Sequence, residues 1–270
     1  MEQVINVLGA GFVGGRYCEL TPNTVKNDRD DYSVKADEVL YFISTIDNYN
    51  VHTNPYLDID TNLTTLIKTL ETCNPHNTFN FISSWFVYGD VELPAKEDSY
   101  CDPKGFYSIT KRTAEQLLIS YCETFGINYR IIRLANVLGK SDTKVSKKKN
   151  ALQYMIEEIK NNRNVEMYDG GNVFRDYIHV DDVVQAINLI LDKGELNTIY
   201  NVGNGKEIYL KDALSYIKDK TGSISELKTR EAAEFHKKVQ TKNMVLDVSK
   251  IQNLGYKPKF DIYQILDTLM

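Results

Sequence analysis

The segment Gly9-Ala10-Gly11-Phe12-Val13-Gly14 decides the fold class of this 270-residue chain. It directly follows the apolar run Val4 to Leu8, which predicts a strand, and it opens a helical stretch. Glycines allow a tight turn and a close backbone approach, so a pyrophosphate can sit on the amino end of the helix. The GxGxxG pattern alone is weak, but between a strand and a helix it favours dinucleotide binding over a structural turn.

Short apolar runs and helical patterns alternate along the first half of the chain. The further runs are Val39 to Ile43, Phe79 to Ile82 and Tyr129 to Leu134. Between them lie apolar residues three or four apart, Leu63-Leu66-Ile67-Leu70 and Ala114-Leu117-Leu118-Tyr121-Phe125. This alternation predicts an α/β fold with a parallel sheet covered by helices on both faces.

The composition excludes several classes of protein. A net charge of -5 argues against a general nucleic-acid binder, whose footprint is usually a basic face. No apolar run approaches the roughly 20 residues that span a bilayer, and the amino terminus lacks the features of a signal peptide. The four cysteines show neither close pairing nor metal-ligand spacing. We therefore expect a cytoplasmic protein with reduced thiols, no metal site and no membrane or nucleic-acid partner. The lysine-rich stretch 144–149 is more typical of a solvated loop than of a binding site.

An acidic residue after the second strand usually holds the adenosine ribose in dinucleotide-binding folds. The candidate is Asp28, which suits the free ribose hydroxyl of NAD. The adjacent Arg29 could instead face the extra phosphate of NADP. A charged surface turn is an equally good interpretation of both residues.

Two further elements carry acid/base chemistry. Tyr107 and Lys111 form a YxxxK pattern whose spacing puts both side chains on one helical face. A nearby ammonium favours the phenolate, so the pattern predicts a lowered pKa for Tyr107 and proton exchange with a sugar hydroxyl. Ser84 follows an apolar strand, at the edge where ligands bind in parallel sheets. Each element alone would suit an exposed helix pair or a turn.

In this order the motifs resemble the extended short-chain dehydrogenase/reductase family, which comprises nucleotide-sugar epimerases, dehydratases and reductases. The resemblance runs from end to end of the chain. Beyond the elements above, it rests on Thr61-Asn62-Leu63, Ser83 to Gly89, Arg133 to Gly139, Phe174 to Val183, Tyr200 to Gly203, Asp247 and Leu254 to Pro258.

The resemblance implies a Rossmann-type doubly wound sheet and an NAD- or NADP-dependent enzyme acting on a nucleotide-diphosphate sugar. It implies that Ser84, Tyr107 and Lys111 are catalytic and that Lys111 also touches the nicotinamide ribose. The cofactor-binding residues it implies are Gly9, Gly11, Phe12, Val13, Gly14, Asp28, Arg29, Ser44, Thr45, Asn62, Ser83, Tyr107, Lys111 and Leu134. The substrate-binding residues are Trp85, Asn136, Arg175 and Arg230.

The resemblance also predicts the organisation of the molecule. We expect a dinucleotide-binding domain over residues 1–140 and a mainly substrate-binding part over 141–270, with segments that return to the first domain. The helices around 63–70 and 114–125 match the pair that relatives often use in a four-helix dimer interface. His179 is expected to be a structural hydrogen-bonding residue, while His52, His76 and His236 match nothing functional.

Two departures from the family narrow the expected reaction. Only a short polar stretch separates Gly14 from Val39, too little for the usual second strand, helix and third strand, so part of the adenosine side should be missing. Sugar 4,6-dehydratases carry an acidic pair after the catalytic hydroxyl residue, where this chain has Trp85 and Phe86. Neither side chain can transfer a proton. We therefore expect reduction of a 4-keto sugar, with 4-epimerisation or a non-catalytic dinucleotide-binding regulator as alternatives.

Overall fold

A parallel sheet of six strands forms the centre of the computed structural model, which describes residues 3–142, 146 and 149–270. Its strands lie in the order β10-β5-β4-β3-β1-β2, and each is parallel to its neighbours. The four predicted apolar runs are all strands of this sheet, so the predicted fold class is confirmed. The strands are β1 (Ile5–Leu8), β2 (Thr24–Lys26), β3 (Glu38–Tyr41), β4 (Thr78–Ser84), β5 (Asn128–Leu134) and β10 (Thr198–Val202).

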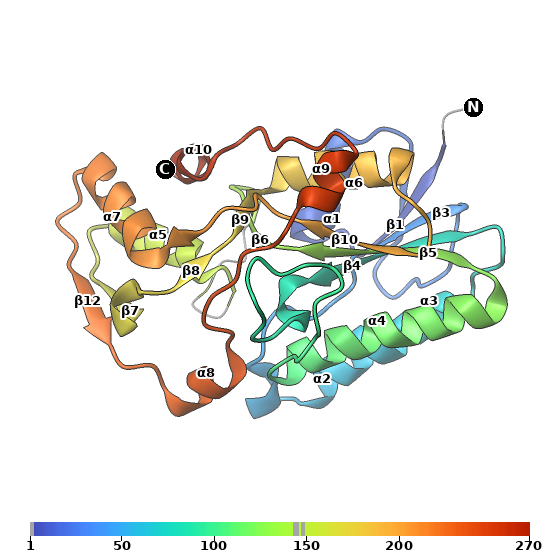
Figure 1. Ribbon diagram of the computed structural model, residues 1–270, viewed down its shortest axis with the longest axis horizontal. Coiled ribbons are helices and arrows are strands. Elements are labelled where there is room, and N and C mark those ends of the chain that lie inside the picture. Colours follow the sequence, from blue (N-terminus) through green and yellow to red (C-terminus); the bar gives the residue numbers. More distant parts are fainter. Residues whose placement is uncertain (1–2, 143–145, 147–148) are drawn as a thin grey trace.

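Helices cover both faces of the sheet (Figure 1). One face carries α1 (Phe12–Leu20) and α6 (Val180–Lys193), which contact each other. The other carries α2 (Tyr56–Ile59), α3 (Thr65–Leu70) and α4 (Phe106–Phe125), with the π-helical turn η2 (Asp60–Thr64) between α2 and α3. A separate hydrophobic cluster fills each side of the sheet. The central strands are therefore buried on both faces, which is why their sequences are continuously apolar.

The segment between β1 and β3 differs from the expectation in one respect. A second strand is present, because β2 pairs with β1 from Ile5 opposite Thr24 to Val7 opposite Lys26. It escaped prediction because it is a three-residue edge strand with no buried side chain. The expected loss of the next helix and strand is confirmed, since residues 27–37 contain neither. Instead the buried side-chain amide of Asn6 donates to the Val25 carbonyl (3.1 Å) and accepts from the Lys35 backbone amide (2.8 Å). These two hydrogen bonds hold the short segment between β2 and β3 in place.

The carboxyl-terminal half forms three small strand pairs beside the main sheet. A hydrophobic cluster of residues 138–270 joins them to the surrounding helices. The strands are β6 (Asn136–Leu138), β7 (Val165–Tyr168), β8 (Phe174–Arg175), β9 (Tyr177–His179), β11 (Ile208–Tyr209) and β12 (Leu227–Arg230). The helices are α5 (Ala151–Lys160), α7 (Leu210–Thr221), α8 (Glu234–Val239), α9 (Ser249–Asn253) and α10 (Ile262–Thr268). Three 3₁₀ turns complete the elements, namely η1 (Asn50–His52), η3 (Trp85–Val87) and η4 (Asp169–Gly171).

Part of this half packs against the main sheet. Met244, Leu246 and Val248 belong to the cluster under α1 and α6, and the Ala95 amide donates to the Val245 carbonyl (2.9 Å). The prediction for His179 is confirmed, because its Nδ1 accepts the Asp181 amide at the start of α6 (3.2 Å).

The remaining expectations concern the surface and the cysteines. All four cysteines are free thiols. No helix within the described residues has the length and apolarity to cross a bilayer. Of the lysine-rich stretch 144–149, positions 144, 145, 147 and 148 lie outside the described residues.

Candidate active site

The three predicted catalytic residues come together where β4 ends and α4 begins. Ser84 is the last residue of β4, and its Oγ accepts the Phe86 amide at the start of η3 (3.3 Å). Tyr107 and Lys111 lie in the first two turns of α4. Gly105 precedes this helix with φ 85°, and a Cβ there would lie 2.6 Å from the Asn48 side-chain oxygen. Glycine therefore allows the start of α4 to approach the loop after β3.

The phenol of Tyr107 is almost wholly buried and faces hydroxyl groups. Burial raises the pKa of Tyr107, while hydrogen bonds with Ser84 and Ser44 act in the opposite direction. The predicted lowering of this pKa by Lys111 is therefore wrong for the protein alone. Desolvation of the phenolate is the larger effect, and the ammonium is bonded elsewhere. The predicted meeting of Tyr107 with Ser84 is found, and Ser44 joins them.

Lys111 lies inside the protein, with 2% of its surface exposed. Its Nζ donates to the Ile82 carbonyl (2.7 Å) and lies 4.1 Å from the centre of the Phe81 ring. Burial lowers the pKa of Lys111 to about 7, and the charge of Glu115 opposes this effect. Near neutral pH the lysine is thus divided between its charged and neutral forms.

Glu115 is a functional candidate that the sequence interpretation missed. Its buried carboxylate accepts from the Ser83 hydroxyl (2.6 Å) and from two nitrogens of Arg133 (3.0 and 2.8 Å). Arg133 is 1% exposed, and Ser83 lies opposite it in the sheet. The hydroxyl of Ser83, predicted to bind cofactor, is therefore engaged with Glu115. Its spacing in the sequence could have identified Glu115, because it follows Lys111 by one helical turn on the same face.

The loop after β3 is fixed by Asn62, another predicted cofactor residue. The Asn62 amide donates to the hydroxyls of Thr45 and Thr110 (both 2.9 Å) and accepts from the Thr45 amide (2.9 Å). Ser44 donates to the Thr45 carbonyl (2.7 Å). Asn62 is 2% exposed, and its contacts hold Thr45 and Ser44, of which Ser44 lies beside Tyr107.

The glycine turn has a shape that suits a dinucleotide. Gly9 adopts φ 90°, and a Cβ there would lie 2.7 Å from the Ile43 amide nitrogen. A Cβ on Gly14 would overlap the Gly9 carbonyl oxygen. At Gly11, in contrast, a Cβ would meet nothing within 4 Å, which leaves the mouth of the turn open. Since the first N–H groups of α1, including those of Phe12 and Val13, begin at this opening, it fits a pyrophosphate.

The other predicted cofactor residues lie around this turn. Asp28 and Arg29 follow β2 and are exposed at the edge of the sheet. Leu134 is the last residue of β5, next to Ser84 in the sheet register. Leu134 ends its strand, whereas Asp28 and Arg29 lie two and three residues beyond the end of β2.

On the substrate side, Trp85 and Arg175 meet. Trp85 is buried and stacks on Phe86 (ring centres 3.9 Å apart), and the Arg175 guanidinium lies 5.2 Å from the Trp85 ring. Arg175 donates to the carbonyls of Phe174, Thr241 and Lys242. Within the described residues no carboxylate forms an ion pair with it. Its positive charge is therefore available to an anion.

The remaining residues predicted to bind substrate are placed differently. Asn136 begins β6 and donates through its side chain to the Asp176 carbonyl (3.1 Å), which places it beside the residue after Arg175. Arg230 is exposed on β12 and pairs with Glu166 (3.0 Å). The structure thus groups Trp85, Asn136 and Arg175, while Arg230 joins a surface ion pair.

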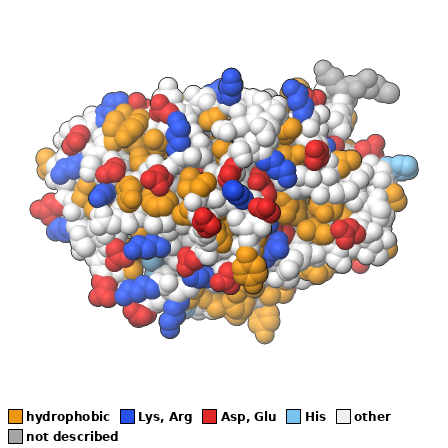
Figure 2. Space-filling view, in the orientation of Figure 1, with side chains coloured by type: hydrophobic (Ala, Val, Ile, Leu, Met, Phe, Trp, Pro, Cys, Tyr) orange, Lys and Arg blue, Asp and Glu red, His pale blue; other side chains and the backbone are white. Residues whose placement is uncertain are grey.

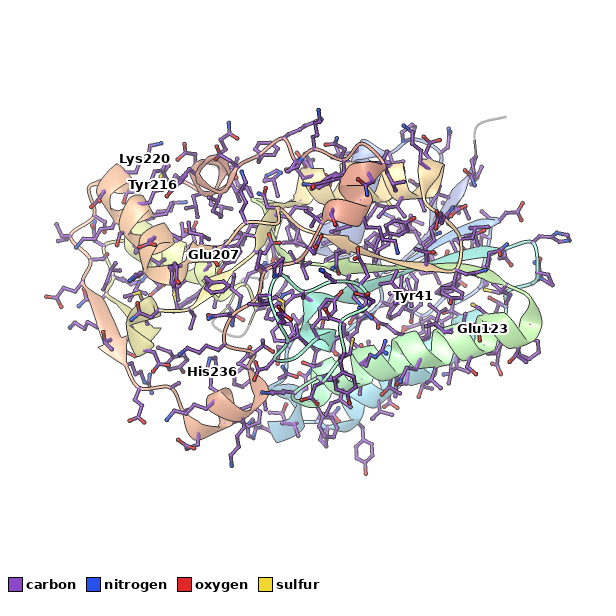
Figure 3. The ribbon with its side chains drawn as sticks, viewed as in Figure 1. Tyr41, Glu123, Glu207, Tyr216, Lys220 and His236 are labelled. Carbon is purple, nitrogen blue, oxygen red and sulfur yellow. The ribbon has the colours of Figure 1, made fainter. Side chains whose placement is uncertain are left out.

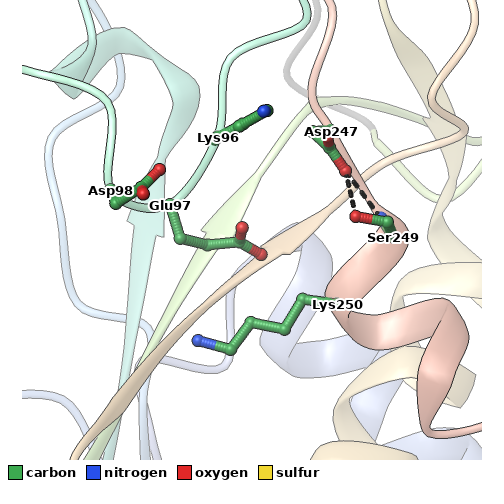
Figure 4. A pocket seen from close by; sticks show the side chains of 6 residues that line it. All are labelled: Lys96, Glu97, Asp98, Asp247, Ser249 and Lys250. Carbon is green, nitrogen blue, oxygen red and sulfur yellow. Dashed lines mark hydrogen bonds between the residues drawn. The ribbon is translucent and has the colours of Figure 1, made fainter.

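A surface cavity of about 350 Å³ lies apart from this group (Figure 4). Acidic and basic side chains line it together, namely Lys96, Glu97, Asp98, Asp247, Ser249 and Lys250. None of the predicted site residues takes part. The cavity touches the Glu115 network through the Glu97 carbonyl, which accepts from Arg133 (3.1 Å).

Comparison with known proteins agrees with the class that this fold and site define. The NAD dependent epimerase/dehydratase family matches residues 16–203, and the chain belongs to this family. A GDP-6-deoxy-D-mannose reductase of Pseudomonas aeruginosa is 26% identical over 76% of this chain and 68% of its own length.

Solved structures share the fold across nearly the whole chain. A UDP-glucose 4-epimerase of Thermotoga maritima, solved with UDP-glucose, has a TM-score of 0.87 and 22% identity, over 98% of this chain and 96% of that one. A Pseudomonas aeruginosa protein named RMD, complexed with NADPH, has a TM-score of 0.84 and 24% identity, over 99% and 97% of the two chains. Because epimerases and reductases are both similar to this chain, the comparisons leave the reaction within the family open.

Proposed function

We propose that this protein is an NAD- or NADP-dependent reductase of a nucleotide-diphosphate 4-keto sugar. One observation carries the proposal: the hydroxyls of Tyr107 and Ser84 meet at the end of β4, with Lys111 one turn further along α4. A regulator that only binds dinucleotide has no need of such an acid/base group. The family and the glycine turn support the cofactor class.

The chain's own groups define the proton path. A sugar carbonyl oxygen placed between Ser84 and Tyr107 would accept hydrogen bonds from both hydroxyls. Tyr107 then donates its proton to that oxygen while Ser84 keeps the oxygen in place. The charge of Lys111, which does not lower the Tyr107 pKa in the protein alone, would favour the tyrosinate once cofactor and substrate occupy the site. The bound dinucleotide supplies the hydride. The backbone at Gly9, Gly11 and Gly14 would hold its pyrophosphate, with Asp28 or Arg29 at the adenosine ribose and Ser44, Thr45 and Leu134 lining the site.

The substrate's diphosphate is assigned to Arg175, with Asn136 beside it. A guanidinium presents a planar set of donors that matches phosphate oxygens. Arg230 is a third candidate, which would have to leave its exposed pair with Glu166. Exposed pairs of this kind contribute little, so the exchange costs little. We assign cofactor binding mainly to residues 1–140 and substrate binding mainly to residues 141–270.

Two features favour reduction over the other reactions of the family. Trp85 and Phe86 occupy the places where a dehydratase needs an acid and a base, and their rings stack on each other. The adenosine side lacks a helix and a strand, so fewer contacts should hold the dinucleotide and it should leave faster. A reductase must exchange its cofactor in each turnover, whereas an epimerase benefits from retaining it. Epimerisation is the second candidate, supported by the likeness to the UDP-glucose 4-epimerase.

We also propose that the protein is a homodimer. Figure 2 shows hydrophobic side chains gathered along the lower edge of the molecule, over the region of α2. The exposed apolar residues of α2, α3 and α4 are Tyr56, Leu57, Ile59, Ile67, Phe106, Ile109, Leu117 and Phe125. Exposed apolar side chains that gather on one face are typical of an interface.

The proposed reaction is tested with a panel of nucleotide sugars and 4-keto nucleotide sugars, each with NAD, NADP and their reduced forms. Absorbance at the reduced-nicotinamide band and product identity are read together. Turnover of a 4-keto sugar with consumption of reduced cofactor supports the proposal. Absence of turnover with every member of the panel would reject it.

A further inference from the structure

The segment 234–242, here called the α8 strap, links the carboxyl-terminal half to the loop after β3 (Figure 1). It contains α8 and ends at the two carbonyls that accept from Arg175. Figure 3 labels His236 on α8, where the strap passes towards the lower helices of the main sheet. None of its residues belongs to a motif used above.

Aromatic and polar contacts join the strap to η1. The Phe235 ring lies 4.2 Å from the His52 ring and 5.4 Å from the Tyr49 ring, measured between centres. The Tyr49 hydroxyl and His236 Nδ1 are 2.9 Å apart. Asn48 donates to the Val239 carbonyl (3.3 Å). The strap is therefore attached to the loop that also carries Ser44.

His236 lies on the same strap as the two carbonyls that bind Arg175. Its ring also packs against the Tyr168 ring, with centres 4.6 Å apart. Burial lowers the pKa of His236, the charge of Arg175 lowers it further, and Asp169 opposes both. Burial and the guanidinium of Arg175 thus both favour the neutral ring. When Nδ1 accepts a hydrogen bond from the Tyr49 hydroxyl, the N–H of the neutral ring is on Nε2. Nε2 is then a hydrogen-bond donor.

Arg175 links the strap to the proposed substrate site. Its guanidinium is held by neutral carbonyls of Thr241 and Lys242, at the end of the strap. A phosphate oxygen is a stronger acceptor for a guanidinium than a carbonyl is. A diphosphate that binds Arg175 therefore competes with the strap's own carbonyls. His236 is on the same strap.

We propose that His236 is a further substrate-binding residue, which donates from Nε2 to the diphosphate held by Arg175, and that Tyr49 orients it across the strap. This inference rests on the proposed function, because it assumes a nucleotide-diphosphate sugar at Arg175. Tyr49 acts as a positioning residue, since it reaches the ligand only through His236.

Calorimetric binding to the full-length protein tests this without turnover. The probes are UDP, dTDP and GDP, each compared with its parent nucleoside. His236→Phe keeps a ring against Tyr168 but removes both nitrogens, and His52→Phe is the matched control in the same strap contact. We expect His236→Phe to weaken binding of the preferred diphosphate at least about tenfold, as loss of a hydrogen bond to a charged group does. Nucleoside binding and the His52→Phe variant should be unchanged.

Tyr49→Phe removes a single hydroxyl and provides a second test. It should weaken diphosphate binding in the same direction by a smaller factor, because Nε2 is no longer fixed as the donor. Unchanged NADPH binding by each variant shows that the glycine turn is intact. If wild type binds a diphosphate and both His236→Phe and Tyr49→Phe bind it equally well, the inference is overturned while the proposed function stands. If wild type binds none of the diphosphates, both are rejected.

Discussion

The ammonium of Lys111 lies 2.7 Å from the carbonyl oxygen of Ile82, two residues before Ser84 on the same strand. The strand that carries Ser84 therefore also holds the lysine. The ammonium charge of Lys111 is thus buried beside the apolar ring of Phe81. The arrangement ties the protonation of Lys111 to the stability of the site.

Burying this charge lowers the free energy of unfolding. Replacing Lys111 by Met should reveal that loss in the pH dependence of stability. The pKa of Lys111 is lowered to about 7 in the folded protein, against about 10.4 when unfolded. Between these values the unfolded chain binds more protons, so the free energy of unfolding of wild type rises with pH relative to the variant. Urea unfolding should show Lys111→Met to be the more stable at pH 6.5, with an advantage that shrinks by pH 9. A constant or growing advantage would show that the lysine is not buried in its charged form.

Tyr107→Phe should abolish most turnover while cofactor binding is kept. The variant removes only the hydroxyl that meets Ser84, and loss of a general acid typically lowers kcat by about 10²–10⁴-fold. Steady-state kinetics and NADPH titration measure the two effects separately. Tyr121→Phe, further along α4, is the control and should retain normal kcat. Near-normal turnover by Tyr107→Phe would remove this tyrosine from the mechanism.

Glu115→Gln should destabilise the fold strongly. The change leaves Arg133, which is 1% exposed, without a carboxylate partner. Breaking a buried pair in this way costs about 3–5 kcal/mol of unfolding free energy. Glu166→Gln breaks the exposed pair with Arg230 instead and should cost less than about 1 kcal/mol. Equal losses for the two variants in denaturant unfolding would contradict the structural role of Glu115.

Leu117→Glu should convert the dimer to a monomer. Leu117 is partly exposed on α4, away from Tyr107, and a carboxylate there would be buried unpaired at the proposed interface. Light scattering should give wild type twice the 30.9 kDa chain mass and the variant a single chain mass. Ile224→Glu, at a site that is 82% exposed, should remain dimeric. A single chain mass for wild type at micromolar concentration would reject the dimer.

The sequence predicts the central sheet well because its strands are buried on both sides. Burial leaves a continuous apolar run, as in Val39 to Ile43, that stands out from the polar segments around it. β2 has the opposite character, since Val25 and Lys26 are exposed at the sheet edge. Its pairing is carried by backbone hydrogen bonds, which leave no pattern in the side chains.

The candidate site could be predicted in part. Tyr107, Lys111 and Ser84 carry recognisable spacings, and the structure brings Tyr107 and Ser84 together. The direction of the Tyr107 pKa could not be predicted, because it depends on how deeply α4 buries the phenol. No sequence pattern pointed to a role for His236. Its partner Tyr49 is 187 positions away in the chain, and only the folded protein places the two together.

The number of reduced nicotinamides consumed per sugar product tests the reductase proposal most directly. The purified protein is first assayed for bound dinucleotide and then incubated with a 4-keto nucleotide sugar and added NADPH or NADH. Because the adenosine side is shortened, we expect little bound dinucleotide, no product without added cofactor, and one reduced nicotinamide oxidised per sugar reduced. Nearly stoichiometric bound NAD, with interconversion of two sugar epimers and no net consumption of cofactor, would contradict the account and identify an epimerase.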